Sequence, residues 1–448
     1  MTIDLDQMTH DMLRAASDAG ADAADAMAVH GTSVSIDVRE GKLEQAERSE
    51  GVDIGLRVMI GQRQANVSCS DTRPETLVEM AQRVVAMARE APEDPNIGLA
   101  ASDGLASDFN VSALELADPA PEPDPATLQD DALRAETAAL AVRGITQVQS
   151  STATYAARQI HMAATNGFSG GHQRTDRAIS CVAIAGSGAE MERDYDGDMR
   201  LFQSDLRSPE DIGRIAAERA VARLGATKPP TGTFPVLFDE RISSSLIGHL
   251  LSAINGTAIA RGASWLRDSL GKTILPDHIS LIEDPHRVRI AGSRAFDGEG
   301  LPTKRRVIVD NGVLTGWTLD LATGRKLGLP STANAARGTS APPSPSNWNV
   351  SLSQGKQSRA DLMREIGTGL LVTSMIGSTI NPNTGDYSRG ASGLWIENGE
   401  ISHPVNECTI AGNLNDMLRR IQPANDARTH LSRVVPSLLI EGMTLAGK

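Results

Sequence analysis

The chain has 448 residues, of which 40% are hydrophobic and 22% charged, and its formal net charge is −13. This length is enough for two domains with cores of their own, and the composition is typical of a folded protein rather than a disordered one. The acidic balance argues against direct nucleic-acid binding, because surfaces that follow phosphates usually carry a basic stripe.

The first half of the chain predicts helices and antiparallel strands. Apolar residues repeat at helical spacing over residues 5–19 and again over 74–91, where Pro74 suits a first helical turn. Period-two alternation predicts strands between residues 34 and 69, and a meander over 148–201 with a hairpin turn at Asn166-Gly167.

Two further helices are predicted from capping residues. Thr127-x-x-Asp130 is a capping-box pattern that opens one helix, and Ser208 followed by Pro209 opens the next. Residues 228–233 then have the composition of a linker, so we place a domain boundary there, between 1–227 and 234–448.

The second half predicts mainly short strands. A strand at 234–238 and a helix at about 242–254 come first, and Asp310-Asn311-Gly312 is a hairpin signal. Ser358-x-x-Asp361 caps one more helix. The predicted fold class is α+β, with an N-terminal domain of helices plus antiparallel sheet followed by a β-rich C-terminal domain.

The segment 381–413, NPNTGDYSRGASGLWIENGEISHPVNECTIAGN, concentrates the unusual residues of the chain. Turn residues begin it, Gly390 and Gly393 permit close backbone approach, and Asn398-Gly399 predicts a tight turn between two strands. A guanidinium can hold a peptide carboxylate, and extended backbone can pair with a peptide strand. The candidate substrate- or partner-binding residues are Thr384, Asp386, Tyr387, Ser388, Arg389 and Ser392; the alternative is that they only build a structural turn.

The order TGDYSRGASG, WIENGEI and TIAGNL resembles the TldD/PmbA family, and its TldE (PmbA) branch in particular. Weaker similarities at residues 51–57 and 296–300 extend the resemblance over almost the whole chain. It implies a subunit of a heteromeric TldD–TldE-type zinc metallopeptidase that acts on small or unfolded peptides, with no cofactor in this chain and zinc on a TldD-type partner. When alone, the chain could form a homodimer. The alternative function is a non-catalytic peptide-binding or scaffold protein on a degenerate peptidase fold.

The TldD branch carries His-Glu-x-x-x-His on a helix early in its C-terminal domain, where the histidines bind zinc and the Glu activates the bound water. Matching that helix on Gly262-Ala263-Ser264 puts Ile247, Gly248 and Ser252 at the ligand, base and ligand positions. His249 lies between them without a second ligand at usable spacing, which favours a structural histidine. We therefore expect neither a catalytic residue nor a metal ligand in this chain.

Four other patterns favour structural interpretations. Gly167-Phe168-Ser169-Gly170-Gly171 matches GxSxG but lacks a following helix, so a hairpin tip is predicted. Asp194, Asp196 and Asp198 lack the Gly and Glu of a calcium loop and predict an acidic turn between strands. Asp297 and Glu299 predict a solvated turn, although two carboxylates could serve acid–base catalysis. Cys408 lies among alternating apolar residues and is predicted to be a core thiol.

The remaining patterns concern location. The three cysteines lie far apart without a CxxC pair, which suits a reducing compartment. The N-terminal segment MTIDLDQMTHDML lacks the basic and apolar regions of a signal peptide, and no apolar run approaches membrane-spanning length. We therefore expect a cytoplasmic protein without membrane association.

Overall fold

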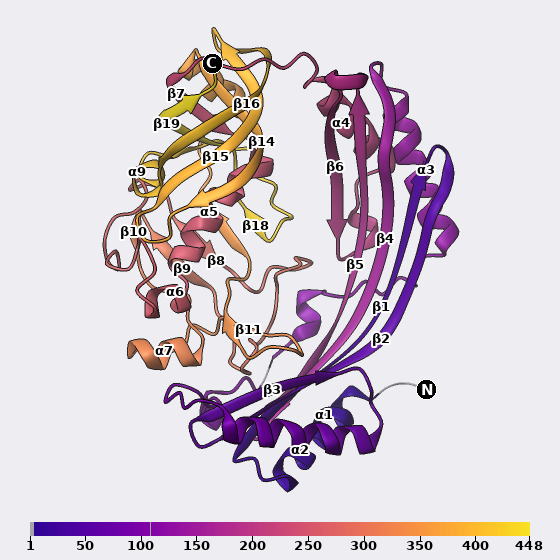
Figure 1. Cartoon of the computed structure of the whole chain (residues 1–448), viewed down its shortest axis with the longest axis vertical. Helices are drawn as coiled ribbons and strands as arrows, with labels where there is room; N and C mark the ends of the chain where they lie inside the picture. Colours follow the sequence, from indigo (N-terminus) through magenta and orange to yellow (C-terminus); the bar gives the residue numbers. More distant parts are fainter. Residues whose placement is uncertain (1–3, 108) are drawn as a thin grey trace.

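A long, curved antiparallel sheet forms the first half of the computed structural model, which describes residues 4–107 and 109–448 (Figure 1). Its strand order is β3-β2-β1-β4-β5-β6. Met1–Ile3, which begin the segment expected to lack a signal peptide, lie outside the described residues. The strands are β1 (Ala23–Arg39), β2 (Lys42–Ile60), β3 (Arg63–Cys69), β4 (Ile145–Ala164), β5 (Ser169–Ala185) and β6 (Glu192–Arg200).

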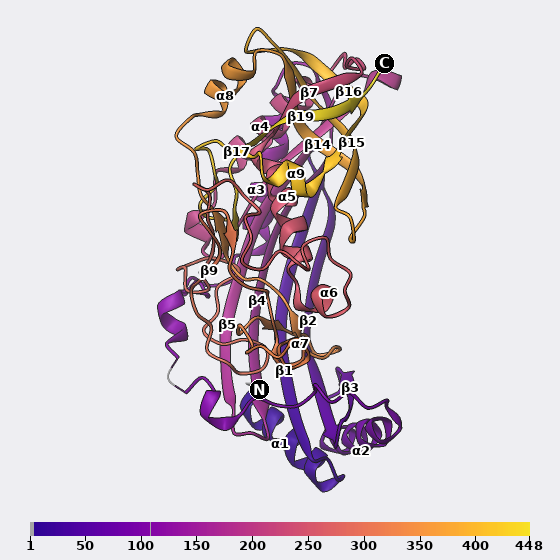
Figure 2. The same ribbon diagram turned by 90° about the vertical axis from the view of Figure 1, so that its left-hand side faces the viewer.

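Two pairs of helices cover one face of this sheet. Near one end, α1 (Leu5–Asp18) and α2 (Pro74–Glu90) bury apolar residues of β1 and β2 such as Ala26 and Leu56. Near the other end, α3 (Pro125–Leu140) and α4 (Pro209–Val221) cover a second apolar cluster. Figure 2 shows the strands running between these two ends along the long axis of the molecule.

The capping predictions for these helices have different outcomes. Ser208 caps α4 as predicted, because its side chain accepts a hydrogen bond from the Asp211 N–H. The predicted capping box at Thr127 is wrong. Asp124 caps α3 instead by accepting from the Ala126 N–H, and Pro125 fills the first helical position, where a missing N–H has no cost.

The second half of the chain folds around a small closed barrel. Strand order β16-β15-β14-β7-β19-β17 and an additional β16–β19 pairing close the sheet on itself. The elements are β7 (Gly232–Phe238), α5 (Glu240–Ala253), α6 (Gly256–Ala260), β8 (Leu281–Glu283), β9 (Arg306–Asp310), β10 (Val313–Leu314), α7 (Leu321–Leu327), β11 (Ala335–Ala336), β12 (Ser344–Pro345), β13 (Val350–Leu352), α8 (Arg359–Ile366), β14 (Gly369–Ile380), β15 (Asp386–Glu397), β16 (Glu400–Asn413), α9 (Leu414–Leu418), β17 (Gln422–Pro423), β18 (Arg433–Val434) and β19 (Leu438–Ala446).

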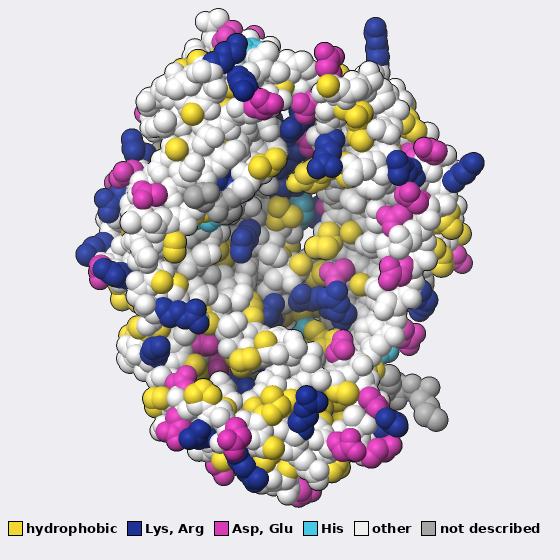
Figure 3. All heavy atoms as spheres, in the orientation of Figure 1, with side chains coloured by type: hydrophobic (Ala, Val, Ile, Leu, Met, Phe, Trp, Pro, Cys, Tyr) yellow, Lys and Arg dark blue, Asp and Glu magenta, His cyan; other side chains and the backbone are white. Residues whose placement is uncertain are grey.

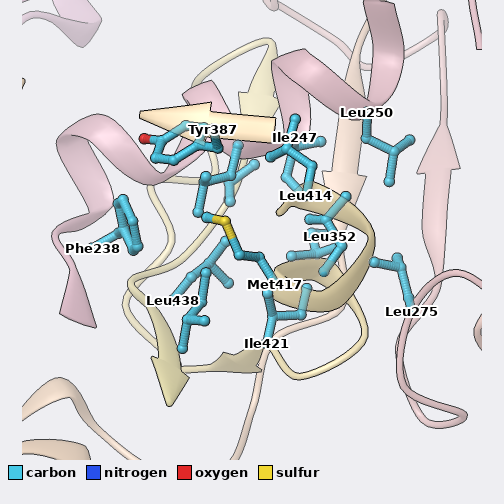
Figure 4. Packing of buried hydrophobic residues seen from close by; sticks show 14 of the residues in the cluster. Phe238, Ile247, Leu250, Leu275, Leu352, Tyr387, Leu414, Met417, Ile421 and Leu438 are labelled. Carbon is cyan, nitrogen blue, oxygen red and sulfur yellow. The ribbon is translucent and has the colours of Figure 1, made fainter. Parts of the chain in front are cut away.

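The largest apolar core joins the barrel strands to α5 and α9. Phe238 of β7, Ile247 and Leu250 of α5, and Met417 of α9 belong to this one cluster, and each is 2% exposed or less. Figure 4 shows these side chains pointing toward one another, with Tyr387 of β15 at the edge of the group. The predicted α+β class is confirmed, with its β-rich C-terminal domain.

The two halves contact each other at several places and leave a hollow between them. Figure 3 shows this hollow, with basic and hydrophobic side chains gathered around it. At one contact the Asn66 side chain donates to the Thr339 carbonyl, and a Cβ on Gly55 would lie 2.1 Å from that carbonyl oxygen. Gly55 therefore permits an approach that any larger residue would block.

The segment between the halves is itself held by hydrogen bonds. The Thr227 N–H donates to the Pro404 carbonyl, and the Lys448 N–H donates to the Pro229 carbonyl. The domain boundary at residues 228–233 stays a prediction. Among the described residues, none of the helices combines the length and apolarity needed to cross a membrane.

Candidate functional site

The turn before β15 is held by its own polar side chains. The Thr384 hydroxyl donates to the Asp386 carboxylate at 2.6 Å, and the Asn413 amide donates to the same carboxylate at 3.0 Å. These hydrogen bonds, first that from Thr384 and then that from Asn413, hold the pKa of Asp386 below its ordinary value. The contacts of Thr384 and Asp386 therefore stabilise the turn.

Ser392 and Gly393 lie where β14, β15 and the N-terminal half meet. The Ser392 hydroxyl accepts a hydrogen bond at 3.5 Å from Arg223, which lies in the turn after α4. A Cβ on Gly393 would lie 1.9 Å from the Leu371 carbonyl oxygen, so only glycine fits there. Ser392 is thus turned toward the N-terminal half, away from the other candidates.

Tyr387 and Arg389 lie on the same face of β15, because side chains two apart on a strand share a face. That face is turned toward α5. Tyr387 is 2% exposed, its hydroxyl lies 3.3 Å from the Met375 sulfur, and burial raises its pKa to about 12. Ser388, between them, belongs to the opposite face.

His249 of α5 joins this pair. Its ring lies 6.0 Å from the Tyr387 ring, centroid to centroid, at an interplanar angle of 68°. Burial lowers the pKa of His249, and the neighbouring Arg389 charge lowers it further. His249 Nε2 and Arg389 Nε are both buried without a hydrogen-bond partner among the described residues. The candidate site is therefore the trio His249, Tyr387 and Arg389.

This trio was not predicted as a unit. The sequence pointed to Tyr387 and Arg389 through their turn-rich segment, whereas His249 looked like an ordinary helix residue. Its position became meaningful only when the fold placed α5 against β15. The signal available in the sequence was a titratable ring next to the apolar residues Leu246, Leu250 and Leu251.

The three positions of α5 that match the metal-binding motif have unrelated environments. Ile247 is wholly buried in the barrel core, whereas Ser252 is exposed and its hydroxyl donates to the Gly248 carbonyl at 2.9 Å. Gly248 has no side chain, and Arg433 lies 3.2 Å from where its Cβ would be. Within residues 4–107 and 109–448, no three His, Cys, Asp or Glu side chains are grouped so that they could hold a metal ion.

The prediction of an acidic turn at Asp194, Asp196 and Asp198 is wrong. All three belong to β6, where they share one buried face because they alternate along the strand. Arginines neutralise them: Arg241 with Asp194 at 3.1 Å, Arg219 with Asp196 at 2.7 Å and Arg200 with Asp198 at 3.0 Å. The triplet therefore fastens β6 to α4 and α5.

The prediction of a solvated turn at Asp297 and Glu299 is also wrong. Asp297 is 1% exposed, and its carboxylate accepts hydrogen bonds from the N–H groups of Glu299, Leu301 and Ala335. Burial raises the pKa of Asp297 to about 6. Burial, followed by the Asp297 charge, raises the pKa of Glu299 to about 8. The turn therefore holds a buried Asp297 and a half-buried Glu299 near the contact between the halves.

Two remaining predictions are confirmed. Ser169 lies at the start of β5 after a hairpin turn in which Gly167 has φ of 98°. Its hydroxyl lies 3.4 Å from His161 Nε2, and the Asp6 carboxylate lies 3.2 Å from that same nitrogen, whereas His161 Nδ1 contacts the Thr9 hydroxyl. A catalytic triad needs the serine and the carboxylate on opposite ring nitrogens, so these described residues do not form one. Cys408 is buried, and burial raises the pKa of its thiol to about 11.

Family models match nearly the whole chain. The PmbA/TldA metallopeptidase models match at residues 24–88 for domain 1, 118–224 for the central domain and 231–447 for the C-terminal domain. Metalloprotease PmbA of Escherichia coli O157:H7 is 37% identical over 93% of this chain and 90% of its own length. A PmbA homolog of Haemophilus influenzae is 36% identical over 96% of this chain and 94% of its own length.

Solved structures share the fold. A protein of Bacteroides thetaiotaomicron, solved as a candidate modulator of DNA gyrase, has a TM-score of 0.91 at 26% identity and covers 99% of this chain and 98% of its own. TldE of Thermococcus kodakarensis has a TM-score of 0.85 at 20% identity, with 98% of this chain and 100% of its own covered.

Proposed function

The chain belongs to the PmbA/TldD metallopeptidase family, and we propose that it is the TldE-type subunit of a heteromeric zinc metallopeptidase acting on small or unfolded peptides. In this proposal a TldD-type partner holds the catalytic zinc. The present chain completes the assembly and helps to hold the peptide.

The observation that carries the proposal is the set of side chains on α5. A catalytic zinc site needs about three protein ligands and one open position for water. Here a buried hydrocarbon side chain, a glycine and an exposed serine stand at Ile247, Gly248 and Ser252, and these do not fit zinc. Zinc bound to the partner would supply an activated water, so hydrolysis is assigned to the partner.

The part proposed for this chain is peptide and partner contact. Arg389 lies half-buried beside His249, on the barrel face that is turned toward α5. A guanidinium in such a place can bind a carboxylate or peptide carbonyls through several N–H groups. Thr384, Asp386 and Ser388 lie at the same end of β15 and stay candidates for this contact. Ser392 faces Arg223 of the N-terminal half, so it would contact a peptide or partner from that side.

Co-purification tests the proposal. A tagged copy of the chain is recovered from its native cell, and the recovered proteins are identified and analysed for zinc. We expect a second family member that carries His-Glu-x-x-x-His, near-equimolar zinc on that partner, and peptide cleavage only when both chains are present. Zinc and chelator-sensitive cleavage on this chain alone would overturn the proposal, and so would a partner equally active without it.

A further inference from the structure

We propose that Arg389 and His249 form a binding site for the free C-terminal carboxylate of a peptide. The inference deepens the proposed function, on which it rests for the assumption that the ligand is a peptide. It names the group on that peptide which the chain recognises.

The first argument is a cation without a counterion. Among the described residues, no carboxylate lies within ion-pair distance of Arg389. By contrast, three arginines that line a cavity of about 590 Å³ each pair with an aspartate or glutamate: Arg223, Arg241 and Arg359. A partly buried guanidinium with no anion nearby is costly unless a ligand supplies the charge.

The second argument is that the neighbouring groups cannot supply that charge. Tyr387 is kept neutral at physiological pH, because burial raises its pKa to about 12. His249 is either neutral or positive, and both burial and the Arg389 charge favour its neutral form. The trio thus presents one positive charge and hydrogen-bond donors, which suits an anion.

The third argument is the presence of two unused buried nitrogens from different elements. Buried polar groups are nearly always hydrogen-bonded, yet Arg389 Nε on β15 and His249 Nε2 on α5 are without partners among the described residues. A carboxylate has two oxygens and about four acceptor positions, so one carboxylate could accept from both groups. Phosphate would also accept, but the proposed function concerns peptides.

The fourth argument is the strand edge beside the site. β14 pairs with β7 only over Leu370–Val372, and its continuation pairs with β15. Ile376, opposite Gly390 in that ladder, is 78% exposed. An extended segment with an apolar side chain and one unpaired edge is the kind of surface on which a peptide adds as a strand. A peptide that adds in the direction that ends beside Ile376 would bring its carboxyl end to the Arg389–Gly390 part of β15.

The test compares a short fluorescently labelled peptide as the free acid and as the C-terminal amide, by anisotropy with the purified full chain. We expect the acid to bind about tenfold or more tightly than the amide, the effect of a charge-assisted hydrogen bond. Arg389→Ala should abolish this preference, Arg389→Lys should keep part of it, and His249→Ala should reduce it. Arg261→Ala, at an exposed arginine of the same domain, is the matched control.

Equal affinity for acid and amide, or no measurable binding of either, would overturn the inference. Loss of partner association in Arg389→Ala with unchanged peptide binding would overturn it too, because the carboxylate would then belong to the partner. Arg389→Gln removes the charge but keeps a polar side chain longer than that of Ala, so it guards against a folding defect in the Ala variant. Peptide binding is measured without zinc and without turnover. A negative result would therefore reject this inference without rejecting the proposed function.

Discussion

Asp25 of β1 and Arg337 of the C-terminal half form an ion pair across the contact between the two halves, with side chains only 7% and 1% exposed. Arg57 of β2 binds the same carboxylate. Burial alone would raise the pKa of Asp25, but the two arginines outweigh it and hold that pKa below its ordinary value. One carboxylate is therefore the shared counterion of two buried arginines that come from different halves.

Replacing Asp25 by Ala should strongly destabilise the protein, because Arg57 and Arg337 would both lose their buried counterion. Breaking a buried pair by removing one partner costs about 3–5 kcal/mol. Urea unfolding measures this change. Asp268→Ala, whose ion pair with Arg267 is exposed, is the control and should stay within about 0.5 kcal/mol of the unchanged chain. Equal effects of the two substitutions would contradict the expected role of Asp25.

The acidic pair at Asp297 and Glu299 predicts a pH-dependent stability. Glu299 titrates at about 8 in the folded chain against an ordinary value of 4.5, so between these pH values the folded chain holds a proton that the unfolded chain has lost. Stability must then fall as pH rises through this window, and it is fully recovered only below about pH 4.5.

Glu299→Gln should remove most of this loss, because Gln cannot ionise yet still accepts a hydrogen bond from the Leu321 N–H. The thermal midpoint of the variant, relative to the unchanged chain, should rise steadily from pH 5 to pH 8.5. The exposed Glu400→Gln provides the comparison and should follow the unchanged chain at every pH. A constant difference across that range would show that Glu299 does not titrate as inferred.

Arg389→Ala should lower peptide turnover by the assembled enzyme more than it lowers stability. Arg389 has no ion pair among the described residues, so folding loses little when it is removed, within a few degrees of thermal midpoint. Turnover is measured with the partner present, and the midpoint with the chain alone. A large drop in midpoint with unchanged turnover would assign Arg389 to folding instead.

Local patterns predicted most of the fold, because they depend on neighbouring residues. The helix from Ser208, the α+β class and the hairpin turn at Asn398-Gly399, with φ of 52° and 80°, follow from spacing and backbone preference. The features that the sequence could not reveal are contacts between residues that lie far apart along the chain. The acids of β6 looked exposed because Arg219 and Arg241, which neutralise them, lie far along the chain.

The same limit applies to the candidate site. Arg389 stood out because turn residues and glycines surround it in the sequence. His249 did not, because its neighbour Tyr387 is 138 positions later, the difference between the two residue numbers. Only the packing of α5 against β15 brings the two rings together, and no periodicity in either segment encodes that contact.

Installing the metal-binding motif should not convert this chain into a zinc peptidase. In the variant Ile247→His, Gly248→Glu, Ser252→His, the first histidine would replace a side chain that is 0% exposed in the largest apolar core, whereas the second would stand on the exposed side of α5. The spacing is that of the TldD motif, but in this chain position 247 is buried in the core and position 252 is exposed. A polar ring at position 247 would also lose the packing of a buried Ile, a cost of about 2–5 kcal/mol.

We therefore expect the triple variant to bind less than one equivalent of zinc and to unfold at a lower temperature than the unchanged chain. Metal content after chelation and reloading, together with the thermal midpoint, measures both effects. Ser252→His alone should leave the midpoint unchanged, since it alters only an exposed position, and so separates the cost at Ile247 from the rest. Equimolar zinc with chelator-sensitive peptide cleavage by the triple variant would refute this, because it would mean that α5 can turn both side chains toward one ion and that a third ligand stands within reach.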